Sequence, residues 1–229
     1  MAHLRCDFRS DAMGMNTSMT VILPEKTDLS QVPVVYLLHG LEDNCTGWAR
    51  YTSVERYARE KNVALVMPEV QRSFYADMDR GLPYFTFIHD ELPEICRGFF
   101  GFSAKREKNY LMGLSMGGYG ALKCGLLAPD TFGAVASLSG GVDAIDCAKD
   151  ADSEGKNGTL WFDIFGPHDQ IKGSDNDLFA VAERLAASGK DKPKVYMWCG
   201  TEDFLYAQNT RMRDHLRALG YDLTYEESP

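Results

Sequence analysis

The stretch NYLMGLSMGGYGAL, residues 109 to 122, places one serine among four glycines between two apolar runs. Its centre, GLSMG at 113–117, fits the pattern Gly-x-Ser-x-Gly, which by chance alone occurs in roughly one chain in ten of this length. The context is more specific, because the run at 110–114 predicts a buried strand and the run that follows predicts a helix. A strand–turn–helix with this pattern is typical of a nucleophile elbow, where glycines leave room around a strained serine. Ser115 is therefore a candidate nucleophile, and the alternative is a Gly-rich turn that only packs a helix.

Strand-like and helix-like segments alternate along the chain. Short apolar runs bounded by glycine or proline predict strands at 19–23, 34–38, 63–67, 110–114, 134–138, 195–198 and 223–225. Helical spacing of apolar residues predicts helices at 48–62, 84–100, 119–127, 177–187 and 204–219. This alternation predicts an α/β fold with a mostly parallel central sheet flanked by helices. Residues 140–175 show little regular pattern, so we expect an irregular cap insertion there.

The overall composition fits a single domain spanning 1–229, because 229 residues with 45% hydrophobic side chains can bury a sizeable core. A net charge of −9 argues against nucleic acid or an anionic membrane surface as a partner, since both are bound through basic patches. No apolar stretch reaches the roughly 18 residues of a membrane span. The six cysteines form no Cys-x-x-Cys pair and the histidines do not cluster. We therefore expect reduced thiols in a cytoplasmic protein and no metal site, while the composition leaves open a monomer or a homo-oligomer.

Acyl-transfer chemistry on a serine requires two N–H groups aimed at the tetrahedral oxyanion. The residue after the nucleophile, Met116, offers one of them. The loop after an early strand usually offers the other, and the stretch YLLHGLEDN at 36–44 fits that loop. The backbone N–H of Leu41 is therefore the second candidate donor.

The candidate acid is Asp203, which lies just past the predicted strand at 195–198. Catalytic groups gather at the carboxyl ends of strands in open α/β sheets, and the acid follows the serine in this chain order. An aspartate here can also cap the helix predicted to begin near residue 204, and both roles can hold at once. Glu202 is the rival acid.

The base that would serve Ser115 is harder to place. The chain contains five histidines: His3, His39, His89, His168 and His215. Only His215 follows Asp203, and the intervening helix would carry it roughly 18 Å from the catalytic face. We expect His39 to bond loop backbone, and His168, in the cap, is the candidate for a substitute base. In this fold the base normally lies on the loop after the last strand, so we expect it just beyond residue 229.

Taken together, these motifs resemble the esterase D-like branch of the α/β-hydrolases, and within it the bacterial tributyrin and cinnamoyl (feruloyl-type) esterases. The matching stretches are VVYLLHGLEDNCTGWARYTSVER, ALVMPE, ELPEICRGFF, KREKNYLMGLSMGGYGALK, FGAVASLSG and CGTEDFLY. The resemblance implies an α/β-hydrolase fold, Ser115 as nucleophile, Asp203 as acid, the Leu41 and Met116 N–H groups as the oxyanion hole, and no cofactor. The family pattern continues after a Ser-Pro into a Gly-rich loop with the catalytic histidine, which implies that 1–229 lacks that loop.

The function that the resemblance implies is a serine carboxylesterase that hydrolyses small short-chain or aromatic esters, such as acetyl, butyryl or cinnamoyl esters, through an acyl-enzyme. S-formylglutathione hydrolase is one alternative. The other is a non-catalytic α/β-hydrolase-fold protein that binds an acyl ligand or a partner, which the absent histidine favours. As a hypothesis, Phe74, Tyr75, Tyr84 and Phe85 shape the substrate pocket together with the cap, although they fit a core role equally well.

Overall fold

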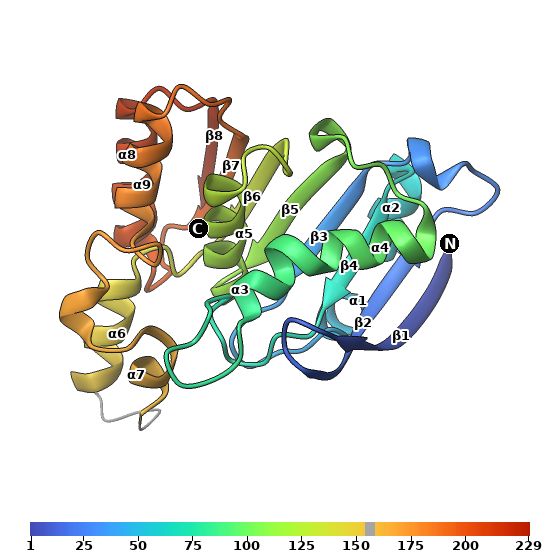
Figure 1. The fold of residues 1–229 in the computed structure, drawn as a ribbon. Helices are drawn as coiled ribbons and strands as arrows, with labels where there is room; N and C mark the ends of the chain where they lie inside the picture. The colour runs from blue at the N-terminus through green and yellow to red at the C-terminus, as the bar shows by residue number, and fades with distance from the viewer. Residues whose placement is uncertain (154–158) are drawn as a thin grey trace.

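The structure is a computed structural model that describes residues 1–153 and 159–229, with the side chains of 150–153 excepted. Over this part of the chain a single sheet has eight strands in the order β1-β2-β4-β3-β5-β6-β7-β8. Their bounds are β1 (Ala2–Ser10), β2 (Met15–Leu23), β3 (Val34–Leu38), β4 (Ala64–Pro68), β5 (Asn109–Leu114), β6 (Ala134–Leu138), β7 (Lys194–Gly200) and β8 (Leu223–Ser228). β2 runs antiparallel to β1 and β4, and the other neighbours are parallel. The predicted fold class is confirmed (Figure 1).

Helices pack on both faces of the sheet (Figure 1). On one face, α4 (Leu92–Phe100), α5 (Met116–Leu127), α8 (Leu178–Ala187) and α9 (Tyr206–Ala218) bury their apolar residues against the strands in the main core. On the other face, α1 (Gly47–Tyr51) and α2 (Val54–Lys61) form a smaller core with Leu37 of β3 and Leu65 of β4. None of the helices in the described ranges combines the length and the apolar composition needed to cross a bilayer.

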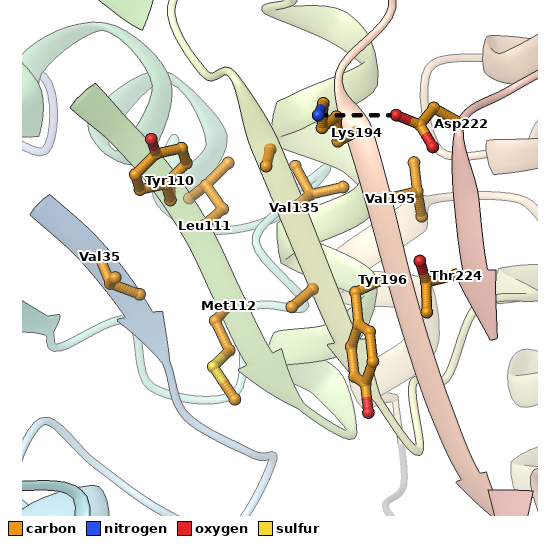
Figure 2. Close-up of a pocket in the computed structure, with 12 residues that line it drawn as sticks. Val35, Tyr110, Leu111, Met112, Val135, Lys194, Val195, Tyr196, Asp222 and Thr224 are labelled. Atoms are coloured by element: carbon orange, nitrogen blue, oxygen red, sulfur yellow. Dashed lines mark ion pairs between the residues drawn. The ribbon is translucent and has the colours of Figure 1, made fainter. Parts of the chain in front are cut away.

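The second face is less covered over β5 to β8. Along β5, β6 and β7, buried residues alternate with half-exposed ones, as in strands that bury one face. The half-exposed side chains of Tyr110, Met112 and Tyr196 line a shallow hollow of about 380 Å³ (Figure 2). An ion pair between Lys194 Nζ and Asp222 Oδ2, 3.9 Å apart, lies beside it. This hollow lies on the sheet face rather than at the carboxyl edge.

The prediction of an irregular cap at 140–175 is wrong for its described residues. They form α6 (Ala144–Ser153), α7 (Leu160–Phe165) and a 3-10 turn, His168–Gln170, and residues 154–158 lie outside the described ranges. Helix α7 buries Trp161 and Ile164, so tertiary packing stabilises a helix too short to be stable alone. The N–H groups of residues 79 and 80 donate to the carbonyls of residues 164 and 163, which ties α7 to the loop after β4.

Three other segments differ from the prediction. β1 was not predicted; its charged residues alternate with apolar ones and it occupies an edge of the sheet, where charges are common. The helix predicted at 48–62 is broken at Thr52, whose extended backbone ends α1. The helix predicted at 84–100 consists of α3 (Tyr84–Thr86), a π-helical turn (Phe87–Glu91) and α4, with Pro93 in the first turn of α4. Proline is tolerated there because that position needs no intrahelical N–H.

Candidate active site

Ser115 lies at the junction of β5 and α5, with φ 55° and ψ −116°. A non-glycine residue rarely adopts such a backbone, and strain of this kind gathers at functional sites. The turn is held in place by its own backbone, because Ser115 N–H donates to Leu138 O at the end of β6 at 2.9 Å. The Ser115 carbonyl accepts from the N–H groups of Gly118 and Gly141 at 3.0 and 3.2 Å. The predicted strand and helix around GLSMG are confirmed, and the catalytic role of Ser115 remains a prediction.

The two glycines that flank Ser115 face other backbone at very short range. A Cβ atom at Gly113 would lie 2.1 Å from Gly117 O, and a Cβ atom at Gly117 would lie 2.2 Å from Leu38 O. Both separations are far inside van der Waals contact, so any side chain would push β3, β5 and α5 apart. The spacing Gly-x-Ser-x-Gly thus has a steric cause in this fold. Because α5 begins directly after Ser115, its first N–H groups, which carry partial positive charge, lie next to the serine.

The loop after β3 begins with His39, which is 1% exposed. Its Nδ1 lies 2.8 Å from Gly40 O, and its Nε2 accepts from Val70 N–H at 3.3 Å. These contacts place a ring proton on Nδ1, and Glu69 Oε1 lies 3.7 Å from Nε2. The prediction that His39 bonds loop backbone is confirmed. Tyr75 supports the same loop from behind, because its hydroxyl donates to His39 O at 3.0 Å.

The backbone N–H groups of Leu41 and Met116 are the candidate oxyanion donors. Within the described ranges, neither N–H group donates a hydrogen bond to another protein atom. Leu41 follows the loop braced by His39, and Met116 is the first residue of α5. Both donors therefore remain available to an oxyanion on a group bound at Ser115, as an acyl-transfer site requires. Their role remains a prediction.

Asp203 lies in the turn between β7 and α9. Its Oδ1 accepts from Leu205 N–H at 2.8 Å, and its carbonyl accepts from Tyr206 N–H at 2.9 Å, so the side chain stabilises the turn that begins α9. The carboxylate is half-buried, whereas Glu202 is exposed. The strands that precede Ser115 and Asp203 both end at the carboxyl edge of the sheet, the edge at which ligands bind in α/β folds. The catalytic role of Asp203 remains a prediction.

A cavity of about 600 Å³ opens at Ser115. Its lining residues are Gly40, Leu41, Glu42, Asp43, Asn44, Arg50, Tyr51, Ser115 and Phe204. Phe204 and Tyr51 are 90% and 71% exposed, so both rings are free to pack against a bound group. The Arg50 guanidinium lies 5.0 Å from the centre of the Tyr51 ring and pairs with no carboxylate of the described residues.

Sequence reasoning missed three of these lining residues, Arg50, Tyr51 and Phe204. One signal was present for Phe204, because it directly follows the candidate acid at the carboxyl edge. For Arg50 and Tyr51 there was no comparable local signal, since they reach the cavity only through the fold of α1 beside the oxyanion loop.

Phe74, Tyr75, Tyr84 and Phe85 do not line this cavity, and their role in a substrate pocket remains a prediction. Phe74, Tyr75 and Tyr84 are at most 4% exposed and belong to the main core. Burial raises the pKa of Tyr75 well above its ordinary value, so its hydroxyl stays a donor to the oxyanion loop. Phe85 is half-buried, and its ring centre lies 5.0 Å from the Nζ atom of Lys123.

For four of the five histidines, the structure shows contacts or positions that do not involve the Ser115 side chain. His39 bonds the oxyanion loop, and His3 lies in the edge strand β1. His89 Nδ1 contacts Asp90 Oδ1 at 2.6 Å. His215 lies in α9, where its Nε2 is 3.1 Å from Phe179 O, as expected for a residue carried away along that helix. His168, the substitute candidate, lies in the 3-10 turn after α7.

Helix α5 also carries a buried cation that the sequence analysis did not single out. Lys123 is 3% exposed, and its Nζ atom donates to Asn176 Oδ1 at 2.6 Å. Burial lowers the pKa of Lys123 to about 8, because the low-dielectric interior disfavours the ammonium form. As for metals, no group of three or more His, Cys, Asp or Glu side chains in 1–153 and 159–229 gathers closely enough to hold an ion.

Known proteins with the same architecture cover almost the whole chain. The family model Esterase matches residues 10–219. An acetyl esterase of Caldicellulosiruptor saccharolyticus is 32% identical over 240 residues, which cover 99% of this chain and 90% of the relative. Two structures from Staphylococcus aureus, the fluorophosphonate-binding serine hydrolase FphF and the S-formylglutathione hydrolase FrmB, are each 34% identical, with TM-scores of 0.91 and 0.89. These matches cover all of this chain and 90% and 91% of the two structures.

Proposed function

Because the chain belongs to the Esterase family, within the α/β-hydrolases that its motifs resemble, we propose that it hydrolyses carboxylic esters through an acyl-enzyme on Ser115. One observation carries the proposal: a strained serine at a strand–helix junction opens into a cavity beside two unpaired N–H groups, those of Leu41 and Met116. The Ser115 oxygen attacks the ester carbonyl as its hydroxyl proton passes to a histidine base, which returns the proton to the departing alcohol, and the two N–H groups stabilise the oxyanion that forms. The alcohol then leaves, and water releases the acid from the serine.

The proposed acid is Asp203, which orients a histidine and stabilises its charged form. β8 runs parallel to β7, and Thr201 N–H donates to Ser228 O, so the end of β8 lies beside the turn that holds Asp203. We propose that the catalytic histidine enters at this edge, beside the turn that holds the acid. His168, from the cap, is the substitute candidate. Replacing His168 by Ala decides between them: a loss of turnover assigns the base to His168, and an unchanged turnover excludes it.

The substrates we propose are small short-chain or aromatic esters. A relative described as an acetyl esterase supports the short acyl group. The exposed Tyr51 and Phe204 rings at the cavity support an aromatic group, since rings of this kind bury large apolar area against an aromatic partner. No cofactor takes part in the proposed reaction. Turnover of nitrophenyl acetate, butyrate and cinnamoyl esters by the wild type, and its loss in Ser115→Ala, tests the proposal. Equal turnover in both proteins would refute it.

A second candidate activity, S-formylglutathione hydrolysis, is favoured by Arg50. Its guanidinium lies at the cavity without a carboxylate partner among the described residues, and glutathione carries carboxylates that it can bind. Arg56 offers a matched control: it lies 5.1 Å from the Tyr57 ring in the same kind of contact, but on α2 and outside the cavity lining. If this activity is correct, Arg50→Ala lowers kcat/KM for the thioester about tenfold and Arg56→Ala does not. An equal effect of both variants, or an equal loss on neutral esters, would argue against it.

A non-catalytic role in binding an acyl ligand is the remaining alternative. It predicts that the wild type binds esters at the cavity but does not release acid, and that a fluorophosphonate leaves Ser115 unmodified. Isothermal titration with a non-hydrolysable ester analogue, run beside the turnover assay, separates binding from catalysis.

A further inference from the structure

Helix α9 begins directly after the turn that carries Asp203, and its first full turn contains a buried amide. Asn209 is fully buried, with 0% of its side chain exposed. Its Nδ2 atom donates two hydrogen bonds of 2.9 Å, one to Leu205 O and one to Gly140 O. An asparagine amide has two N–H donors, so both are used. The side chain therefore joins the start of α9 to the loop that follows β6.

Each of the two carbonyls belongs to a residue that is linked to a proposed catalytic residue, either directly or through the next residue, by one backbone N–H hydrogen bond. On one side, Leu205 donates its N–H to Asp203 Oδ1 at 2.8 Å, and the Leu205 carbonyl accepts from the side chain of Asn209 as well as from its backbone N–H at 3.1 Å. On the other side, the residue after Gly140 donates its N–H to the Ser115 carbonyl at 3.2 Å. Hydrogen bonds, joined by short stretches of backbone, thus connect the carboxylate of Asp203 through Asn209 to the nucleophile elbow. These two residues come from strands that are not neighbours in the sheet.

We propose that Asn209 is a positioning residue that fixes the acid turn relative to the nucleophile elbow. This inference rests on the proposed ester hydrolysis at Ser115. The interior burial of a polar amide is costly unless it is hydrogen-bonded, and its Oδ1 has no partner within the described ranges. An apolar residue of similar size would avoid that cost. The two carbonyls need hydrogen-bond donors, which the Asn209 amide provides.

The neighbouring residue Gln208 provides a matched control. It is 6% exposed, and its Oε1 accepts from Asp143 N–H at 2.8 Å, in the same loop after β6. Its hydrogen bonds reach neither residues 140 and 141 nor Leu205. Gln208 therefore anchors the loop without joining the acid turn to the elbow, and loss of its side chain reports on general loosening of the loop.

The experiment compares Asn209→Ser, Asn209→Asp and Gln208→Ser in the full chain. A serine in a helix donates to the carbonyl four residues earlier, which here is Leu205 O, but it is too short to keep the bond to Gly140. Asn209→Asp keeps the shape of the side chain and replaces the two N–H donors with at most one, the O–H of a protonated carboxyl. Thermal unfolding, kcat and KM on a nitrophenyl ester, and amide hydrogen exchange of Gly141 and Leu205 are measured for each variant.

The expected result for Asn209→Ser is a fall in kcat of about tenfold per folded molecule with little change in KM, because misplaced catalytic groups slow the reaction more than they weaken binding. Exchange at the Gly141 N–H becomes about fivefold faster, as expected when one supporting hydrogen bond is lost, and exchange at the Leu205 N–H is unchanged. Asn209→Asp accelerates exchange at both amides. Gln208→Ser keeps kcat within about twofold of the wild type.

The proposal is overturned if Asn209→Ser and Gln208→Ser lose equal turnover in proportion to their unfolded fractions, since Asn209 would then act only in packing. It is also overturned if exchange at Gly141 is unaffected by Asn209→Ser. This second readout does not depend on catalysis. If the wild type hydrolyses no ester, the proposed function fails, and the exchange data still decide whether Asn209 couples the turn to the elbow.

Discussion

Replacing Gly117 by Ala perturbs the proposed active site at the point where α5 packs most tightly against β3. The added Cβ atom would lie 2.2 Å from Leu38 O, 2.6 Å from the Leu38 carbonyl carbon and 2.9 Å from His39 O. Ordinary C···O separations are about 3.3 Å, so backbone atoms must move by about 1 Å. Overpacking of this kind costs about 1–3 kcal/mol of unfolding free energy, which exceeds the gain of about 1 kcal/mol from alanine in a helix. The displaced residues lead into Leu41, so turnover should fall about 100-fold.

Urea unfolding followed by tryptophan fluorescence measures the stability, and hydrolysis of a nitrophenyl ester measures the turnover. Gly98→Ala serves as the control, because Gly98 is exposed in α4 and an added Cβ would meet nothing within 4 Å. It should raise the unfolding free energy by about 0.5–1 kcal/mol without changing turnover. If Gly117→Ala were as stable and as active as Gly98→Ala, the steric account of the elbow would be refuted.

Two further predictions concern ionisable side chains, Lys123 in α5 and the candidate acid Asp203. The pKa of Lys123 is lowered from 10.5 to about 8 in the folded chain. Between these two pH values the unfolded chain binds more protons than the folded chain, so the contribution of Lys123 makes the unfolding free energy rise with pH. The rise is about 3 kcal/mol at most. The difference in unfolding free energy between wild type and Lys123→Met should show this rise from pH 8 to 10, and a difference that is flat with pH would contradict it.

Asp203→Asn should keep the urea midpoint, since an amide oxygen can still accept from Leu205 N–H, while turnover falls roughly 1,000-fold or more. Asp203→Ala should lose about 1 kcal/mol as well, and a variant that stayed fully active would exclude Asp203 as the acid.

The parallel strands at the centre of the fold were predictable because they are buried on at least one face and bounded by glycine or proline. β3 and β6 match their predicted ranges, and β5 and β7 differ from theirs by one or two residues at the ends. β1 was not predictable in this way, since its pattern of Arg5, Asp7 and Arg9 reflects an exposed edge. Helices α6 and α7 form where tertiary packing overrides a weak local preference.

Some residues of the candidate site were also predictable from the sequence, and others were not. Ser115, the oxyanion loop and Asp203 were predictable because each follows a strand, and all such residues meet at one edge of a parallel sheet. The aromatic residues that line the cavity were not predictable, because the sequence does not show whether an aromatic ring faces a cavity or the core. Tyr75 packs inside and braces the loop, whereas Phe204 is 90% exposed at the cavity.

Active-site labelling shows whether Ser115 is an activated nucleophile. The chain is treated with a fluorophosphonate, and the modified peptide is located by mass spectrometry in the wild type and in Ser115→Ala. We expect a single adduct on Ser115 that is absent from the variant. An unmodified wild-type chain, or an equal adduct on another serine in both proteins, would contradict it.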